Sequence, residues 1–220
     1  MKNLLLSSFC ILFGFNPCFS QIEFGIKGGF TKSWPGYGEI ELPEDAETSV
    51  NGYNISFLFG VPFNSRFGLI ISPGFAKKGA ACFPGWQPDF IGDSNVYLNY
   101  IELPVMLSRK FELQNGKFKI APSIGYGFSV LNSASSHQDL SFPDGTNVVV
   151  RNIEIGDDST RSLERFDHGF YASIRFNRLI LQNHFVFIES TYYHGMKDYD
   201  KLNTSKNRNV NLNFGFGYTI

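Results

Sequence analysis

Histidine and acidic side chains are the residues of this sequence that could support catalysis. His194 lies near Glu189 and Thr191, which is the closest approach in the chain to a constellation of base, acid and hydroxyl. Side chains five positions apart face opposite sides of a strand, so Glu189 and His194 would not meet there. No serine is placed to act as a nucleophile with them. We therefore expect no catalytic residues, and a lipid-acting enzyme at a membrane rim is kept as an alternative.

Metal and cofactor sites have equally weak support. The histidines at positions 137, 168, 184 and 194 lack the convergent spacing of a zinc site. Asp157 with Asp158 and Asp198 with Asp200 could hold calcium, but paired acids in loops are normally solvated. The glycines interrupt apolar segments and form no phosphate cradle, and a net charge of -1 gives no electrostatic basis for nucleic-acid binding. We expect no metal, no cofactor and no nucleic-acid partner.

The elements that would position these residues are clearest at the end of the chain. Residues 209–220 read NVNLNFGFGYTI, with apolar or aromatic residues at even positions and Asn, Gly or Thr at odd positions up to 219. An alternation of period two predicts a β-strand with one apolar face and one polar face. Whether the apolar face points into a core or toward lipid decides the class of protein.

The same alternation recurs and predicts eight strands. In YNISFLFGV (53–61) the apolar and aromatic residues occupy odd positions, with Leu58 as an exception on the other face. The composition, with 24 Phe, 10 Tyr and 22 Gly, favours strands and turns over helices. The predicted strands lie at 22–30, 53–61, 66–78, 96–110, 117–130, 166–176, 184–195 and 209–220.

The connections between these segments alternate in length. Short turns are expected near 63–66, 113–116 and 177–183, whereas 131–165 is the longest connection and contains NVVVRNIEI (147–155), which predicts strands beyond the membrane. Long and short connections in rotation place all long loops at one end of a meander. Bacterial transmembrane barrels have this layout and an even number of strands. We therefore predict an all-β fold, an eight-stranded antiparallel up-and-down transmembrane β-barrel.

The orientation of the barrel follows from the size of its interior. Eight strands enclose a lumen just wide enough to be filled by side chains, too narrow for the aromatic residues of every strand. A soluble barrel would expose Gly, Ser and Asn with few charges, since only 18% of the residues are charged. The apolar faces should therefore contact lipid, and a soluble lipocalin-like binder is the structural alternative. Just past strand ends, an aromatic girdle is expected from Trp34, Phe83, Trp86 and Phe90.

Charged residues on the strands fall mostly on the polar face and predict ion pairs in the lumen. A single charge inside the barrel would be unfavourable, but opposite charges can pair and satisfy one another. Glu23 and Lys78 share this face but are expected at wet strand ends. The predicted lumen network, which is structural, consists of Lys27, Glu102, Lys119, Arg175 and Glu189, with hydroxyl groups from Tyr100 and Tyr171.

The beginning of the chain predicts a secretory signal peptide. Lys2 provides a positive start, and LLLSSFCILFGF (4–15) is an apolar run too short for a membrane anchor. We expect residues 1–20 to be the signal peptide and residues 21–220 to form the barrel domain. Only Cys82 would remain after cleavage, so no internal disulfide is expected.

Several stretches resemble the PorT-like outer membrane β-barrel protein family. They are FGIKGGF (24–30), YIELPVMLSRKF (100–111), APSIGYGFSV (121–130) and the closing aromatic strand. The resemblance covers nearly the whole mature chain and implies an eight-stranded barrel in the outer membrane. The most distinctive element is Y-[LI]-E-[IL]-P, formed here by Tyr100, Ile101, Glu102, Leu103 and Pro104.

The resemblance also implies partners and a place in the cell. The final strand would be recognised by the barrel-assembly machinery, although Ile220 rather than an aromatic residue is last. One family member is needed for type IX protein secretion, so contact with envelope or secretion-complex proteins is implied. We expect a non-enzymatic protein of the cell outer membrane, in contact with outer membrane lipid, that has a structural or anchoring role and presents extracellular loops. A narrow passive pore for ions or small solutes is the alternative.

Overall fold

The computed structural model describes residues 22–37, 49–82, 91–113, 117–141, 147–148, 163–200 and 205–220. No helix in these ranges is long and apolar enough to cross a membrane. The predicted signal peptide lies outside the described residues. The described strands, in chain order, are β1 (Glu23–Tyr37), β2 (Val50–Pro62), β3 (Phe67–Ile71), β4 (Gly74–Cys82), β5 (Ile91–Arg109), β6 (Phe111–Leu113), β7 (Phe118–Ser141), β8 (Asn147–Val148), β9 (Phe166–Leu181), β10 (His184–Asp200) and β11 (Ser205–Thr219).

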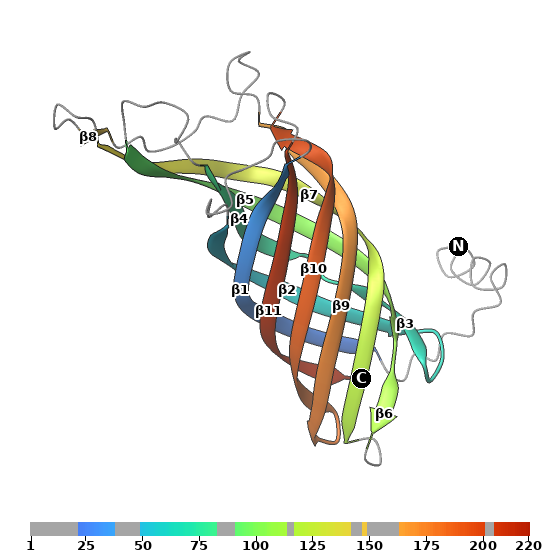
Figure 1. Cartoon of the computed structure of the whole chain (residues 1–220). Helices are drawn as coiled ribbons and strands as arrows, with labels where there is room; N and C mark the ends of the chain where they lie inside the picture. The colour runs from blue at the N-terminus through green and yellow to red at the C-terminus, as the bar shows by residue number, and fades with distance from the viewer. Residues whose placement is uncertain are drawn as a thin grey trace.

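These strands form one sheet that closes into a barrel with a wall of eight strands (Figure 1). Two wall strands are interrupted. β3 and β4 together form the third, which breaks at Ser72 and Pro73 because proline has no N–H to donate to a neighbouring strand. β6 continues β5 beyond Lys110 and pairs with β7, as β5 does.

Antiparallel pairing between chain neighbours builds the wall, and pairing between the first and last strands closes it. β1 pairs with β11 from Glu23 opposite Thr219 to Tyr37 opposite Ser205. The predicted eight-stranded antiparallel up-and-down barrel is thus confirmed. The predicted turn at 177–183 is shorter than expected, because β9 continues to Leu181 and only Gln182 and Asn183 form the turn. Residues 178–181 are all exposed there, so no alternation marked them as a strand.

Two strands are longer than the sequence pattern indicated. β5 has 19 residues and β7 has 24, and together they project beyond the barrel at its loop end (Figure 1). Asn132 is an extra residue in β7, since Asn99 faces Ser133 while Tyr100 faces Leu131. The projecting part of β7 reads NSASSHQD, which has no apolar face to detect. Of the predicted strand at 147–155, Asn147 and Val148 form β8, and the rest lies outside the described residues.

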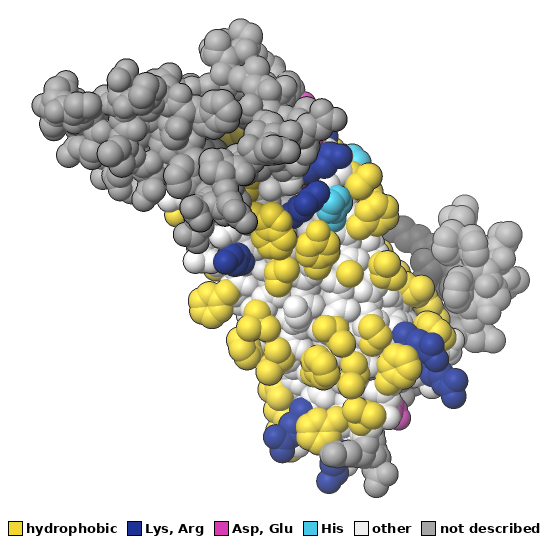
Figure 2. All heavy atoms as spheres, in the orientation of Figure 1, with side chains coloured by type: hydrophobic (Ala, Val, Ile, Leu, Met, Phe, Trp, Pro, Cys, Tyr) yellow, Lys and Arg dark blue, Asp and Glu magenta, His cyan; other side chains and the backbone are white. Residues whose placement is uncertain are grey.

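The apolar faces of the strands point outward, as predicted. Phe30 is 73% exposed and Ile124 is 65% exposed, whereas Thr31 and Ser123 beside them are buried. Figure 2 shows the resulting belt of hydrophobic side chains around the visible face of the barrel. A barrel with an apolar exterior and a polar interior is suited to lipid surroundings.

The lumen also contains an apolar layer that the sequence pattern did not predict. Phe185 and Phe187 of β10 point inward and face two glycines of β11. A Cβ atom on Gly215 would lie 2.2 Å from the Phe187 ring, and one on Gly217 would lie 2.3 Å from the Phe185 ring. The glycines therefore make room for the rings. The layer consists of Leu58, Ile70, Met106, Tyr171, Phe185, Phe187 and Tyr193.

Candidate functional site

The candidate site is the set of charged side chains inside the barrel. At the turn end, Glu23 of β1 accepts hydrogen bonds from Lys110 Nζ at 2.6 Å and from Arg175 Nη2 at 3.0 Å. Arg175 is fully buried, with its guanidinium carbon 5.4 Å from the centre of the Phe187 ring. The expectation of a wet strand end for Glu23 is wrong, because two cations cover its carboxylate.

A second pair lies farther along the lumen. Lys27 of β1 forms an ion pair with Glu189 of β10, and Thr191 Oγ1 donates a hydrogen bond to the same carboxylate at 3.1 Å. Glu189 is fully buried and lies directly opposite Arg175 in the pairing of β10 with β9. Alternation places all these side chains on the inner face, and the barrel brings strands far apart in sequence into contact.

A third pair lies toward the loop end. Lys78 Nζ of β4 lies 2.5 Å from Glu102 Oε1 of β5. The same ammonium group lies 3.8 Å from the centre of the Tyr193 ring, a cation–π distance. Lys78 was expected at a wet strand end, and this is wrong, because it is only 1% exposed. Its position beside the carboxylate and aromatic rings compensates for its removal from water.

A carboxylate that pairs with no cation among the described residues lies near this pair. Asp167 accepts a hydrogen bond from Asn207 Nδ2 at 2.9 Å, and the same amide group donates to the Tyr100 hydroxyl at 3.1 Å. Asn207 begins a row of buried amides on β11 that continues with Asn209, Asn211 and Asn213. The odd-numbered asparagines of the closing strand therefore line the lumen and supply both donors and acceptors there.

Lys119 lies apart from the other predicted members of the network. Its ammonium group pairs with Glu112 of β6 at 3.1 Å, and the two side chains are 31% and 58% exposed. β7 extends past the filled part of the lumen at its turn end, so position 119 has the inward parity but reaches water. The structure brings Lys27 to Glu189 and places Glu102 and Arg175 in separate pairs. The sequence pattern did not identify Lys110 as a lumen cation, because it lies between β5 and β6 and belongs to neither strand.

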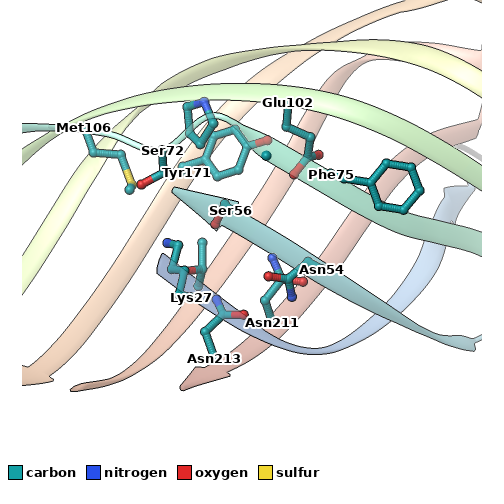
Figure 3. Close-up of a pocket in the computed structure, with 13 residues that line it drawn as sticks. Lys27, Asn54, Ser56, Ser72, Phe75, Glu102, Met106, Tyr171, Asn211 and Asn213 are labelled. Carbon is teal, nitrogen blue, oxygen red and sulfur yellow. The ribbon is translucent and has the colours of Figure 1, made fainter. Parts of the chain in front are cut away.

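Between the charged groups lies a small space lined by described residues. This cavity has a volume of about 30 Å³, with room for one or two water molecules. Figure 3 shows Lys27 and Asn213 on one side of this cavity and Tyr171 and Glu102 on the other. Carboxylate, ammonium, hydroxyl and amide groups line it, so the space is suited to water.

The possible catalytic constellation is divided by the barrel wall. Glu189 lies in the lumen, whereas His194 lies on the outer face, where its Nδ1 atom is 3.4 Å from the Tyr192 hydroxyl. Within the described ranges no three His, Cys, Asp or Glu side chains come together as metal ligands would. Asp157 and Asp158 lie outside the described residues.

Part of the expected aromatic girdle is present at the loop end. The Trp34 ring on β1 packs beside the Tyr192 ring on β10, with the ring centroids 6.5 Å apart. Tyr126 and Phe170 make an edge-to-face contact at 5.2 Å farther round the wall. The other predicted members, Phe83, Trp86 and Phe90, lie outside the described residues.

Comparison with known proteins gives a family and a location. Among solved structures, the chain is similar to Ail of Yersinia pestis, at 15% identity over 89% of this chain and 98% of that one, with a TM-score of 0.37. It is also similar to OprG of Pseudomonas aeruginosa, at 11% identity over 90% of this chain and 95% of that one, with a TM-score of 0.48. A third similar structure is outer membrane protein W of E. coli, at 15% identity over 90% of this chain and 97% of that one, with a TM-score of 0.44. None of the curated proteins compared with the chain matches it.

The match that decides the family covers most of the sequence. The model of the outer membrane protein beta-barrel domain matches residues 16–201, which include strands from β1 to β10. The match does not separate PorT-like members from other barrels of this kind. Together with the closed wall and apolar exterior, it shows that the chain belongs to the outer membrane protein beta-barrel domain family and is an integral protein of the outer membrane.

Proposed function

We propose that the protein is a closed, non-catalytic barrel that anchors and presents loops at the surface of the outer membrane. The observation that carries this proposal is the row of ion pairs through the lumen. Glu23 and Arg175 join β1 to β9, which are separated by β11 and β10 in the wall. Side chains from opposite parts of the wall therefore meet inside the barrel and occupy the space that a pore would need.

The energetics of the pairs favour a lumen that stays closed. Each charge is removed from water and is stabilised by its partner and by neighbouring hydrogen bonds. A permeating ion would have to separate these partners and leave charges buried without compensation, which is strongly unfavourable. The 30 Å³ cavity offers a place for water but no room for a hydrated ion.

The anchoring role is supported by the asymmetry of the two ends. β2–β3 and β9–β10 connect through short turns at one end, whereas β5 and β7 project from the other (Figure 1). A rigid scaffold with protruding segments is a common arrangement for presenting a binding surface. Envelope proteins are the class of partner that such a surface would meet.

A link to type IX secretion rests on the PorT-like resemblance. The most distinctive element of that resemblance lies within β5, where Glu102 binds Lys78 and Tyr100 binds Asn207, both inside the barrel. Ile101 and Leu103 face outward toward lipid. This element is thus accounted for by the barrel itself, and contact with secretion proteins would use the loop end. Co-purification from gently solubilised envelope tests such contact, with loss of the captured partner expected when residues 83–90, between β4 and β5, are replaced by glycine and serine.

Conductance across a planar lipid bilayer tests the closed lumen. We expect no openings from the purified protein. A variant with Glu23, Lys27, Arg175 and Glu189 all changed to serine removes two acids and two bases and should conduct, because water can then fill the lumen. Changing Glu112 and Lys119 to serine removes one acid and one base of an exposed pair, and this control should remain silent. Steady openings from the unchanged protein would support a narrow pore and contradict the proposal.

The absence of catalysis is also part of the proposal and has its own test. The separation of Glu189 from His194 by the wall supports it, since an acid and base must be within hydrogen-bond reach to act together. Incubation with radiolabelled phospholipid should give no product. Formation of product that is lost on His194→Ala would show that the outer rim is an active site.

A further inference from the structure

A group of basic side chains lies on the outer face of β1 and β11, near the loop end. Lys32 of β1 and Lys206 and Arg208 of β11 are at even positions, which are the outward positions of these strands. Arg208 lies opposite Trp34 on one side and opposite His194 on the other. Lys32 is opposite Val210, one outward position from Arg208. The three cations and His194, here called the rim cluster, therefore lie on three adjacent strands.

The cations of the rim cluster have no acidic partner in the described part of the chain. Asp198 is opposite Lys206 in the pairing of β10 with β11, but no ion pair forms between them. By contrast, Lys27, Lys78, Lys110 and Arg175 in the lumen each contact a carboxylate. Among the described residues, the rim cluster thus carries positive charge on the outside of the barrel without an ion-pair partner.

Arg208 has a defined position in this group. A Cβ atom added to Gly36 would lie 2.6 Å from Arg208 Nε and 2.8 Å from Cζ, so the guanidinium group lies flat against β1 at the glycine. The Nε atom is buried and has no hydrogen-bond partner among the described residues. A guanidinium group held in this way presents its fork of donors in a fixed direction, which suits a phosphate group.

The surroundings place the rim cluster at the border of the membrane. Trp34 and Tyr192 contact each other beside Arg208, and such aromatic residues occupy the interface between lipid and water. Next along the outer face of β11 are Val210 and Leu212, both exposed and apolar. Figure 2 shows Lys, Arg and His side chains bordering the hydrophobic belt at the loop end. A headgroup could contact the cations while its acyl chains follow the belt.

We propose that the rim cluster binds the phosphate of an anionic lipid in the leaflet that surrounds the loop end. Arg208 is the principal ligand, Lys32 and Lys206 supply further positive charge, and Trp34 contacts the lipid near its headgroup. Continuity with the apolar belt favours a lipid over a soluble anion. This assignment does not depend on whether the lumen conducts.

Fluorescence of Trp34 provides a local test. The chain has two tryptophans, so Trp86→Phe leaves Trp34 as the only one. The protein is reconstituted in phosphatidylcholine vesicles that contain either phosphatidic acid with brominated acyl chains or brominated phosphatidylcholine at the same mole fraction. We expect the brominated phosphatidic acid to be enriched at Trp34 by about fivefold or more, the effect of one or more basic residues near an anionic surface.

Two matched triple variants separate this site from general charge. Changing Lys32, Lys206 and Arg208 to glutamine should abolish the preference for phosphatidic acid. Changing Arg66, Lys117 and Arg178, which are exposed at the turn end, removes the same charge and should leave the preference unchanged. Equal quenching by both lipids in the unchanged protein would overturn the proposal, as would equal loss of the preference in both triple variants.

Gly36→Ala tests the geometry without altering any charge. Because the added methyl group would displace the guanidinium group of Arg208, we expect the preference to fall by at least half. An unaltered preference would overturn the assignment of Arg208 as the principal ligand. Inorganic phosphate in the buffer should not compete, and loss of the preference on its addition would replace the lipid by a soluble anion and overturn the proposal.

Discussion

The lumen and the outer rim carry the same kinds of charged residues under opposite conditions. Lys27 and Lys32 lie on β1 five positions apart, so one faces the lumen and the other faces outward. Lys27 is buried in an ion pair with Glu189, whereas Lys32 is exposed and unpaired among the described residues. The comparison shows that a charge must have a partner where its inward position also buries it in the lumen. In the lumen a carboxylate provides the compensation, and at the rim water or a headgroup provides it.

β9 shows the same contrast at the turn end. Arg175 is fully buried and paired with Glu23, whereas Arg178 is exposed with its guanidinium carbon 5.6 Å from the centre of the Phe118 ring. Both guanidinium groups lie beside an aromatic ring, but of the two only the inner-face arginine also pairs with an acid among the described residues. Variants that alter one region while leaving the other intact test this difference.

The largest effect is expected from breaking a lumen pair. Glu189→Leu would leave Lys27 buried without its partner and should lower the free energy of unfolding by about 3–5 kcal/mol. Urea unfolding in lipid vesicles, followed by tryptophan fluorescence, measures this change. The double variant with Lys27→Met should recover most of the loss, because no unpaired charge remains. Additive losses in the double variant would show that the two residues do not act as a pair.

A charge placed on the outer face should have a somewhat smaller effect. Phe214 lies on the outward face of β11, with two apolar outward residues, Val210 and Leu212, between it and Arg208. Phe214→Lys should lower the free energy of unfolding by about 2–4 kcal/mol, the range for a lysine near the middle of the bilayer. Phe214→Leu is the control and should have much less effect. Similar stability for both variants would indicate that this face does not contact lipid.

Filling the space beside an inward phenylalanine tests the apolar layer. Gly215→Ala should lower the free energy of unfolding by about 1–3 kcal/mol, because the methyl group overlaps the Phe187 ring. In the double variant with Phe187→Leu, the combined loss should be smaller than the sum of the two single losses. Simple additivity would mean that Gly215 and Phe187 are not in contact.

The smallest effect is expected from the exposed pair at the turn end. Glu112→Gln removes the partner of Lys119, but both side chains reach water, so the free energy of unfolding should change by less than about 1 kcal/mol. The same urea titration compares this variant with Glu189→Gln. Equal losses for the two variants would remove the distinction between a pair buried in the lumen and a pair that reaches water.

The sequence alone was enough to predict the strands and the direction of their faces. Alternation with period two identified all eight wall strands, and it placed Lys27, Arg175 and Glu189 on the inner face. It could not predict which acid meets which base, because that depends on the closure of the barrel and on strand tilt. For this reason Lys78 was assigned to a wet end although it reaches Glu102 and Tyr193.

Features without a hydrophobic pattern were also missed. The extension of β7 is mostly polar in sequence and the last residues of β9 are all exposed, so nothing in their alternation distinguished them from loops. The inward rings of Phe185 and Phe187 were missed although they share the odd positions of Glu189 on β10, and the register shows the glycines that make room for them. Pairs of glycines at inward positions of one strand are a signal that could have indicated large inward residues on the next.

Spin labels introduced one at a time along β11 test most directly whether the apolar side chains face lipid and the polar ones fill the lumen. In vesicles, labels at 210, 212, 214 and 216 should collide often with oxygen dissolved in the lipid, whereas labels at 209, 211 and 213 should be shielded from both oxygen and a water-soluble nickel chelate. That pattern corresponds to apolar side chains in lipid around a filled lumen. Free access of the nickel chelate to the odd positions would show an open, water-filled interior and contradict the account.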